Sequence, residues 1–229
     1  MYERKVREGT IQRDDFQRQI VSILDHLHYD LRTYKQPPVP DVEACLDATT
    51  STSWGLWGSL TSWFSPNTHG EASCPSFRPA GTPQGLYLYG DVGTGKSMLM
   101  DLFYHTLPTN ITRKRRVHFH QFMIDVQKSS HAFKARYRDK GHDDVDPIEP
   151  VIRDIAQKAE VLCFDEFQVV DIADAMILRR LLEGLLRYGV VIVTTSNRHP
   201  TELYKNGIQR SSFIPCIELI ESQYHVVSL

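Results

Sequence analysis

Hydrophobic residues follow two alternating patterns along the chain. Five short runs that are apolar, aromatic or β-branched have the composition of buried strands: 85–89, 117–121, 161–164, 190–195 and 224–229. Apolar residues at helical spacing predict helices elsewhere: 97–107, 122–137, 147–159, a long helix capped by Asp171, and a short one at 208–213. This alternation predicts an α/β fold, in which helices cover both faces of a mainly parallel, five-stranded sheet.

An amphipathic segment precedes the alternating region. Apolar residues recur at helical spacing from Phe16 to Leu31, which predicts a helix over Thr10–Tyr34. This helix either packs on the domain that follows or borders a ligand through Gln17, and we favour packing. Residues 1–35 are therefore expected to form a helical segment against a core of residues 84–229.

Residues 36–83 differ in composition from both neighbours. Seven prolines and many serines, threonines and glycines predict an irregular insertion. Its aromatic stretch, 54–64, contains three tryptophans and could rest on a membrane interface or a partner. Because it lacks a basic face, packing on the protein's own surface explains it equally well, and we lean towards that interpretation.

One stretch after the first strand fits the phosphate-binding pattern G-x-x-x-x-G-K-[ST]: Gly90, Asp91, Val92, Gly93, Thr94, Gly95, Lys96 and Ser97. Glycines allow backbone N–H groups to approach phosphate oxygens, and the following helix adds the positive end of its dipole. Lys96 is suited to the β- and γ-phosphates, and the Ser97 hydroxyl is suited to Mg²⁺. A Gly-rich turn without a ligand would not explain the Lys-Ser pair, so the sequence predicts a nucleoside triphosphate site.

Two acids end the strand at 161–164. In a parallel sheet this strand end lies at the edge where ligands bind, beside the phosphate loop. Asp165 is predicted to hold Mg²⁺ through water, and Glu166 to act as the general base towards an attacking water. A solvated strand end is the alternative, but the position about seventy residues after a phosphate loop favours a catalytic pair.

Polar and basic residues follow the strand at 190–195. Asn197 is the candidate that holds the water or the γ-phosphate, and the alternative is an ordinary turn before Pro200. Arg198 and Arg210 are candidates for an arginine that reaches a neighbouring subunit's nucleotide. For each arginine alone, a surface salt bridge explains the residue equally well.

Composition narrows the classes of partner. Lys+Arg total 26 and Asp+Glu 28, so the net charge of -2 argues against broad nucleic-acid binding. Four well-separated cysteines resemble reduced thiols rather than a disulfide framework or a zinc site. His118 and His120 would share one face of the predicted strand, but without a third ligand we interpret them as structural. The first residues resemble neither a secretory signal nor an acid-poor transit peptide.

Several segments together resemble the Afg/ZapE-type AAA+ ATPases, which include mitochondrial proteins and a bacterial cell-division ATPase. The resemblance rests on the phosphate loop with its strand and on four further segments: 116–120, 162–168, 171–176 and 203–210. It implies a three-layer P-loop NTPase of AAA+ type, with Lys96 and Ser97 in the Walker A motif and Asp165 and Glu166 in the Walker B motif. It also places Asn197 at the sensor-1 position and favours Arg210 as the arginine finger.

The resemblance implies ATP and Mg²⁺ as ligands, a homo-oligomer, protein partners, and a mitochondrial role in quality control or respiratory-chain maintenance. Peripheral membrane association and the absence of sequence-specific nucleic-acid binding complete these expectations. AAA+ proteins normally continue into a helical lid, whereas this sequence ends with the last predicted strand, so no C-terminal lid is expected within it. A nucleotide-gated binding module with little hydrolysis therefore stays an alternative, as do a small-molecule kinase and a nucleic-acid motor.

Overall fold

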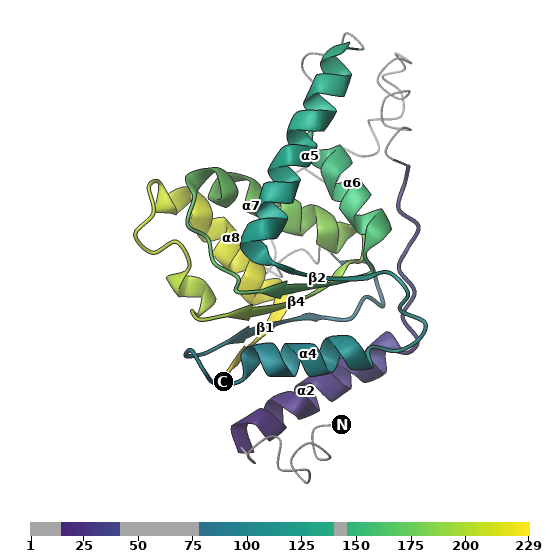
Figure 1. Ribbon diagram of the computed structural model, residues 1–229, viewed down its shortest axis with the longest axis vertical. Helices are drawn as coiled ribbons and strands as arrows, with labels where there is room; N and C mark the ends of the chain where they lie inside the picture. The colour runs from purple at the N-terminus through teal and green to yellow at the C-terminus, as the bar shows by residue number, and fades with distance from the viewer. Residues whose placement is uncertain (1–14, 42–77, 140–145) are drawn as a thin grey trace, which may run out of the picture.

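The computed structural model describes residues 15–41, 78–139 and 146–229, and its centre is a parallel sheet (Figure 1). The described strands are β1 (Gly85–Tyr89), β2 (Lys114–His118), β3 (Val161–Asp165), β4 (Val191–Ser196) and β5 (Tyr224–Ser228). They lie in the order β2-β3-β4-β1-β5, and every neighbouring pair is parallel. The predicted five-stranded α/β sheet is confirmed.

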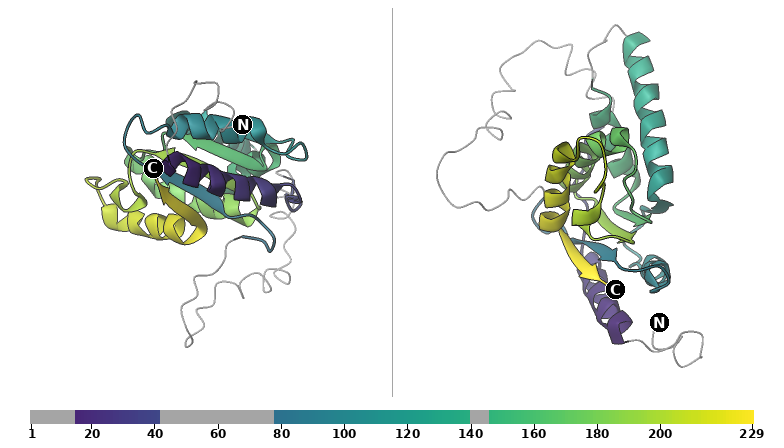
Figure 2. Two further views of the ribbon diagram at one scale, coloured as in Figure 1. Left: turned by 90° about the horizontal axis from the view of Figure 1, so that it is seen from below. Right: turned by 90° about the vertical axis from the view of Figure 1, so that its left-hand side faces the viewer.

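Helices cover both faces of this sheet (Figures 1 and 2). One face carries α2 (Asp15–Leu31) and α4 (Lys96–Thr106). The other carries the remaining α-helices of the described chain: α5 (Phe119–Asp139), α6 (Ile148–Lys158), α7 (Ile172–Arg187) and α8 (Arg210–Gln223). A short 3₁₀ helix, η3 (Pro200–Glu202), follows β4. The fold is therefore three-layered, as expected.

Successive strand residues serve two separate cores because side chains alternate across a sheet. In β3, Val161 and Cys163 pack with α2 and α4, whereas Leu162 and Phe164 pack with α5, α6, α7 and α8. All four are buried, which explains why this strand reads as an unbroken apolar run. The same alternation decides which face Asp165 joins, two residues after Cys163.

The N-terminal segment contacts the helices on both faces of the sheet. Helix α2 lies along α4 (Figure 2), and the chain after it crosses to the opposite face of the sheet. There the Gln36 amide donates hydrogen bonds to the carbonyl oxygens of Ala156, at 3.1 Å, and Tyr188, at 2.9 Å. The Tyr34 hydroxyl donates to the carbonyl of Gly189. Packing of this segment on the core is thus observed.

The described residues leave part of the predicted insertion untouched. Residues 42–77, with the tryptophan-rich stretch at 54–64, lie outside them, so the division at residues 36 and 83 stays a prediction. The first residues of the predicted N-terminal helix also lie outside. Within the described ranges, no helix combines the length and the apolar character needed to cross a bilayer.

Two predicted boundaries are wrong. The second strand covers Lys114–His118 rather than 117–121, and helix α5 begins at Phe119. His118 therefore ends a strand while His120 lies in a helix, so the two do not share a strand face. The short helix expected at 208–213 is the 14-residue helix α8, which continues through Pro215.

Helix α7 begins as predicted. The Asp171 carboxylate accepts a hydrogen bond from the backbone N–H of Ala173 at 2.7 Å, which caps the helix. Leu178, Leu181, Leu182 and Leu185 of this helix are buried. Met176, in contrast, is 51% exposed.

Candidate nucleotide-binding site

The loop between β1 and α4 takes a shape that only glycine adopts easily. Gly93 and Gly95 have φ values of +88° and +91°, and Gly95 is the N-cap of α4. At Gly90 a Cβ atom would lie 2.4 Å from the carbonyl oxygen of Leu229, so the end of the chain packs against this loop. The loop thus presents backbone N–H groups beside a helix N-terminus, which is an arrangement suited to anions.

Lys96 lies under this loop and is only 7% exposed. Its ammonium donates hydrogen bonds to the carbonyl oxygens of Gly90, at 2.9 Å, and Asp91, at 2.6 Å. Burial lowers the pKa of Lys96, and the nearby Asp91 carboxylate opposes this effect. These neutral acceptors hold the ammonium in the loop, and phosphate oxygens would be stronger partners for it.

The two acids after β3 have different environments. Asp165, the last residue of β3, is 6% exposed and lies on the α4 face, whereas Glu166 is exposed. Glu166 has a φ of +55°, which turns the chain sharply between the two side chains. Thr195 of β4 holds this turn: its hydroxyl accepts from the Glu166 N–H at 3.2 Å, and its carbonyl accepts from the Phe167 N–H at 2.7 Å.

A cavity of about 300 Å³ brings together residues that are far apart in the sequence. Lys96 and Ser97 reach it from the start of α4, Glu166 from the turn after β3, and Asn197 from the turn after β4. The structure thus brings together at one cavity the residues that the sequence predicted as phosphate site, base and polar amide, and their roles stay predictions. Arg210 does not line the cavity; its guanidinium donates to the carbonyl oxygen of Thr201 in the same chain.

Two residues contact the site although the sequence did not assign them that role. Arg116 of β2 donates from Nε to Asp165 Oδ2 at 2.6 Å, and from Nη1 to Asp101 of α4. Burial lowers the pKa of Arg116, but the hydrogen bonds to the two carboxylates outweigh it and leave this pKa raised. No pattern in the sequence indicated these contacts, because they join three separate elements.

Gln17, which the sequence offers as a possible ligand contact but for which we favoured packing, is the second residue. Its side-chain amide donates to the carbonyl oxygen of Thr94 at 3.2 Å. Helix α2 therefore packs on the core, as favoured from the sequence, and also contacts the phosphate loop. The amphipathic pattern identified the packed face of α2, and the contact of Gln17 with Thr94 depends on how this helix sits against the loop.

The residues present fit a magnesium ion. Ser97 is an exposed residue in the first turn of α4, and Asp165 lies at the end of β3 on the face of the sheet that carries α4. Hydroxyl, carboxylate and phosphate oxygens are the hard ligands that Mg²⁺ prefers, directly or through water. Asp165 does not itself line the cavity, and its Oδ2 accepts a hydrogen bond from Arg116, so Asp165 and Ser97 as holders of the ion stay a prediction.

Comparison with known sequences decides the family. A sequence profile described as AFG1-like ATPase matches residues 72–229, which include the loop, both acids and the sheet. The chain belongs to the AFG1-like ATPase family. Its parallel sheet with the phosphate loop after β1 is the core of a P-loop NTPase of AAA+ type.

Relatives of this AFG1-like chain occur in bacteria and eukaryotes. An uncharacterized protein of Schizosaccharomyces pombe is 46% identical over 235 residues, which cover 100% of this chain and 49% of the relative. The cell division protein ZapE of Escherichia coli K12 is 36% identical over 229 residues, covering 100% of this chain and 53% of ZapE. A crystal structure of DnaI is 16% identical, covers 64% of this chain and 73% of DnaI, and has a TM-score of 0.47. The chain thus spans about half the length of the Schizosaccharomyces pombe protein and of ZapE.

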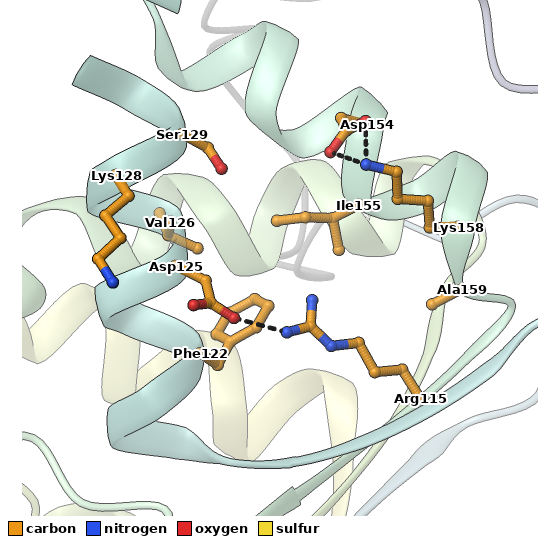
Figure 3. Close-up of a pocket in the computed structure, with 10 residues that line it drawn as sticks. All are labelled: Arg115, Phe122, Asp125, Val126, Lys128, Ser129, Asp154, Ile155, Lys158 and Ala159. Carbon is orange, nitrogen blue, oxygen red and sulfur yellow. Dashed lines mark hydrogen bonds and ion pairs between the residues drawn. The ribbon is translucent and has the colours of Figure 1, made fainter. Parts of the chain in front are cut away.

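A second cavity of this AFG1-like chain lies away from the phosphate loop. It measures about 290 Å³ and lies between β2, α5 and α6 (Figure 3). Two ion pairs line it. Arg115 of β2 pairs with Asp125 of α5, and Lys158 pairs with Asp154 within α6, each at 2.7 Å. Because these charges are already paired with each other, we assign no ligand to this cavity.

Proposed function

We propose that this chain binds ATP with Mg²⁺ and hydrolyses it to ADP and phosphate. The cavity that unites Lys96, Ser97, Glu166 and Asn197 carries the proposal. The Lys96 ammonium, the phosphate loop and the exposed Glu166 carboxylate all border this cavity, and this grouping supports binding of phosphates next to a group that can accept a proton. Membership of an ATPase family supports the same reaction.

Each residue has a distinct role in this proposal. The N–H groups from Gly90 to Ser97 surround the phosphates, and the Lys96 ammonium leaves the loop carbonyls for the β- and γ-phosphate oxygens. Ser97 and Asp165 would hold Mg²⁺, which would supply positive charge to offset the triphosphate. Glu166 accepts a proton from the attacking water, and the Asn197 amide holds that water or the γ-phosphate.

The wider role follows from the family resemblance. We propose that the protein works as a homo-oligomer in which Arg210 approaches the nucleotide of the neighbouring subunit. Protein partners, action in mitochondrial quality control or respiratory-chain maintenance, and peripheral membrane association belong to the same proposal. In the oligomer, the Arg210 guanidinium would then give up its hydrogen bond to the Thr201 carbonyl oxygen and donate to a phosphate oxygen at the neighbouring subunit instead.

Glu166→Gln separates binding from hydrolysis. We expect the variant to bind ATP as tightly as the parent and to release phosphate at least about a hundredfold more slowly, because the amide cannot accept the proton. Lys96→Ala is the matched variant for binding, and we expect its ATP affinity to fall more than about tenfold. Calorimetry and a phosphate-release assay measure the two properties.

The outcomes distinguish the proposal from its alternative. Equal phosphate release by the parent and Glu166→Gln would refute the role of Glu166. Tight, Lys96-dependent binding without phosphate release by the parent would instead identify a nucleotide-gated binding module. Unchanged affinity in Lys96→Ala would refute the nucleotide site itself.

A further inference from the structure

One arginine joins three elements around the predicted metal-binding carboxylate. Arg116 is paired in register with Cys163 of β3, so its side chain lies on the face of the sheet that carries α4. Its guanidinium uses one nitrogen for Asp165 at the end of β3 and another for Asp101 of α4. These two contacts connect the end of β3 with α4, the helix that begins at Lys96.

The charges in this group are unequally exposed. Asp165 is buried, Arg116 is mostly buried, and the Asp101 side chain is 56% exposed. A buried carboxylate needs a partner, because removing an isolated charge from water is costly. Arg116 provides a positive charge at 2.6 Å from Asp165 Oδ2, and the Thr195 hydroxyl donates a longer hydrogen bond, at 3.5 Å, to Oδ1. Asp101 also contacts the guanidinium and offsets part of its charge.

We propose that Arg116 is a positioning residue that orients the Asp165 carboxylate and sets how strongly nucleotide binding depends on Mg²⁺. This inference rests on the proposed nucleotide function. Without metal, an uncompensated Asp165 would repel the triphosphate. The guanidinium offsets this repulsion, and it also weakens the attraction between Asp165 and a divalent cation. The coupling between metal and nucleotide is therefore smaller with Arg116 than without it.

Substitution of Arg116 tests this coupling. In Arg116→Gln we expect the affinity for a fluorescent ATP analogue in EDTA to fall about fivefold, and its affinity at saturating Mg²⁺ to stay near the parent value. The Mg²⁺ concentration that gives half of the effect should fall by a similar factor. Arg116→Lys keeps the charge and should retain the metal-free affinity, although the two-pronged contact is lost.

Asp101→Asn should act in the opposite direction. This substitution removes one of the two negative charges beside Arg116, so the guanidinium offsets the charge of Asp165 more fully. Because this weakens the attraction of Asp165 for the cation, we expect the half-saturating Mg²⁺ concentration to rise about twofold. Asp101 is largely exposed, so this variant keeps the test open if Arg116→Gln folds poorly. Thermal unfolding monitored by circular dichroism checks the folding of every variant.

Arg115→Gln is the matched control. Arg115 is the preceding residue of β2, lies on the opposite face, and pairs with Asp125 of α5 (Figure 3). Its removal should leave the Mg²⁺ dependence of the parent unchanged. The proposal is overturned if Arg116→Gln matches the parent, if Asp101→Asn shifts the metal dependence in the same direction as Arg116→Gln, or if Arg115→Gln shifts it equally. Absence of any Lys96-dependent nucleotide binding by the parent would overturn the proposed function instead.

Discussion

Glu166 holds a left-handed backbone conformation next to the buried carboxylate of Asp165. For a residue with a Cβ atom this conformation costs about 1–2 kcal/mol, because Cβ crowds the following carbonyl oxygen. The two hydrogen bonds to Thr195 maintain it. Strain of this kind concentrates at functional sites, and here it directs the exposed carboxylate into the cavity with Lys96 and Asn197.

Replacement of Glu166 by glycine or alanine measures this strain. Neither substituent can act as a base, but only glycine accepts a φ of +55° at low cost. We therefore expect Glu166→Gly to unfold with a free energy about 1 kcal/mol larger than Glu166→Ala, measured by urea denaturation. An alanine variant as stable as the glycine variant would show that this turn is not strained.

The elements show where the sequence was sufficient and where it was not. Asp171 was recognised as a cap because Ser, Thr, Asn and Asp before a helical pattern mark helix starts locally. The residues from Val117 to Gln121 alternate like a strand, but Phe119 packs against Phe164 and Phe167 from the first position of α5. Helix α8 is longer than the short helix predicted at 208–213 and contains Pro215, a residue that normally disfavours a helix interior; Phe213, Ile217 and Ile220 are buried on this helix.

Loss of the Asp171 cap should weaken the start of helix α7 and thereby lower the stability of the protein. Asp171→Ala leaves the Ala173 N–H without its side-chain acceptor, and we expect a loss of about 1 kcal/mol in the free energy of unfolding. Asp171→Ser retains an acceptor and should lose much less. A thermal-denaturation series with both variants checks this, and equal losses would mean that charge rather than capping is responsible.

At the scale of the whole molecule, two cores meet across the sheet and helices pack closely within each. Helices α6 and α7 approach at Gly184, where a Cβ atom would lie 2.7 Å from Cδ1 and 2.8 Å from Cγ2 of Ile152. The absence of a side chain at Gly184 thus sets the distance between these helices. The same close packing supports the layer that lies behind β3 and its acids.

Gly184→Ala should destabilise the protein although alanine favours helix formation. We expect a loss of about 1–3 kcal/mol in the free energy of unfolding, because the methyl group overpacks against Ile152. In an Ile152→Ala background the contact atoms are absent and the same substitution should cost almost nothing. Urea denaturation of the four proteins gives the coupling, and an equal cost in both backgrounds would exclude overpacking as the cause.

The sequence by itself determined the phosphate loop, four of the five strands and the acids at the end of β3, because these depend on contiguous residues and on periodicity within one element. Glycines at 93 and 95, for example, express a local backbone requirement that can be read without knowing the neighbours. Only the tertiary structure decided that Arg116 meets Asp165 and Asp101, that Gln17 meets Thr94, and that Asn197 joins Lys96 at one cavity. Such contacts join residues that the chain separates widely, and their geometry follows from strand order and packing rather than from any local pattern.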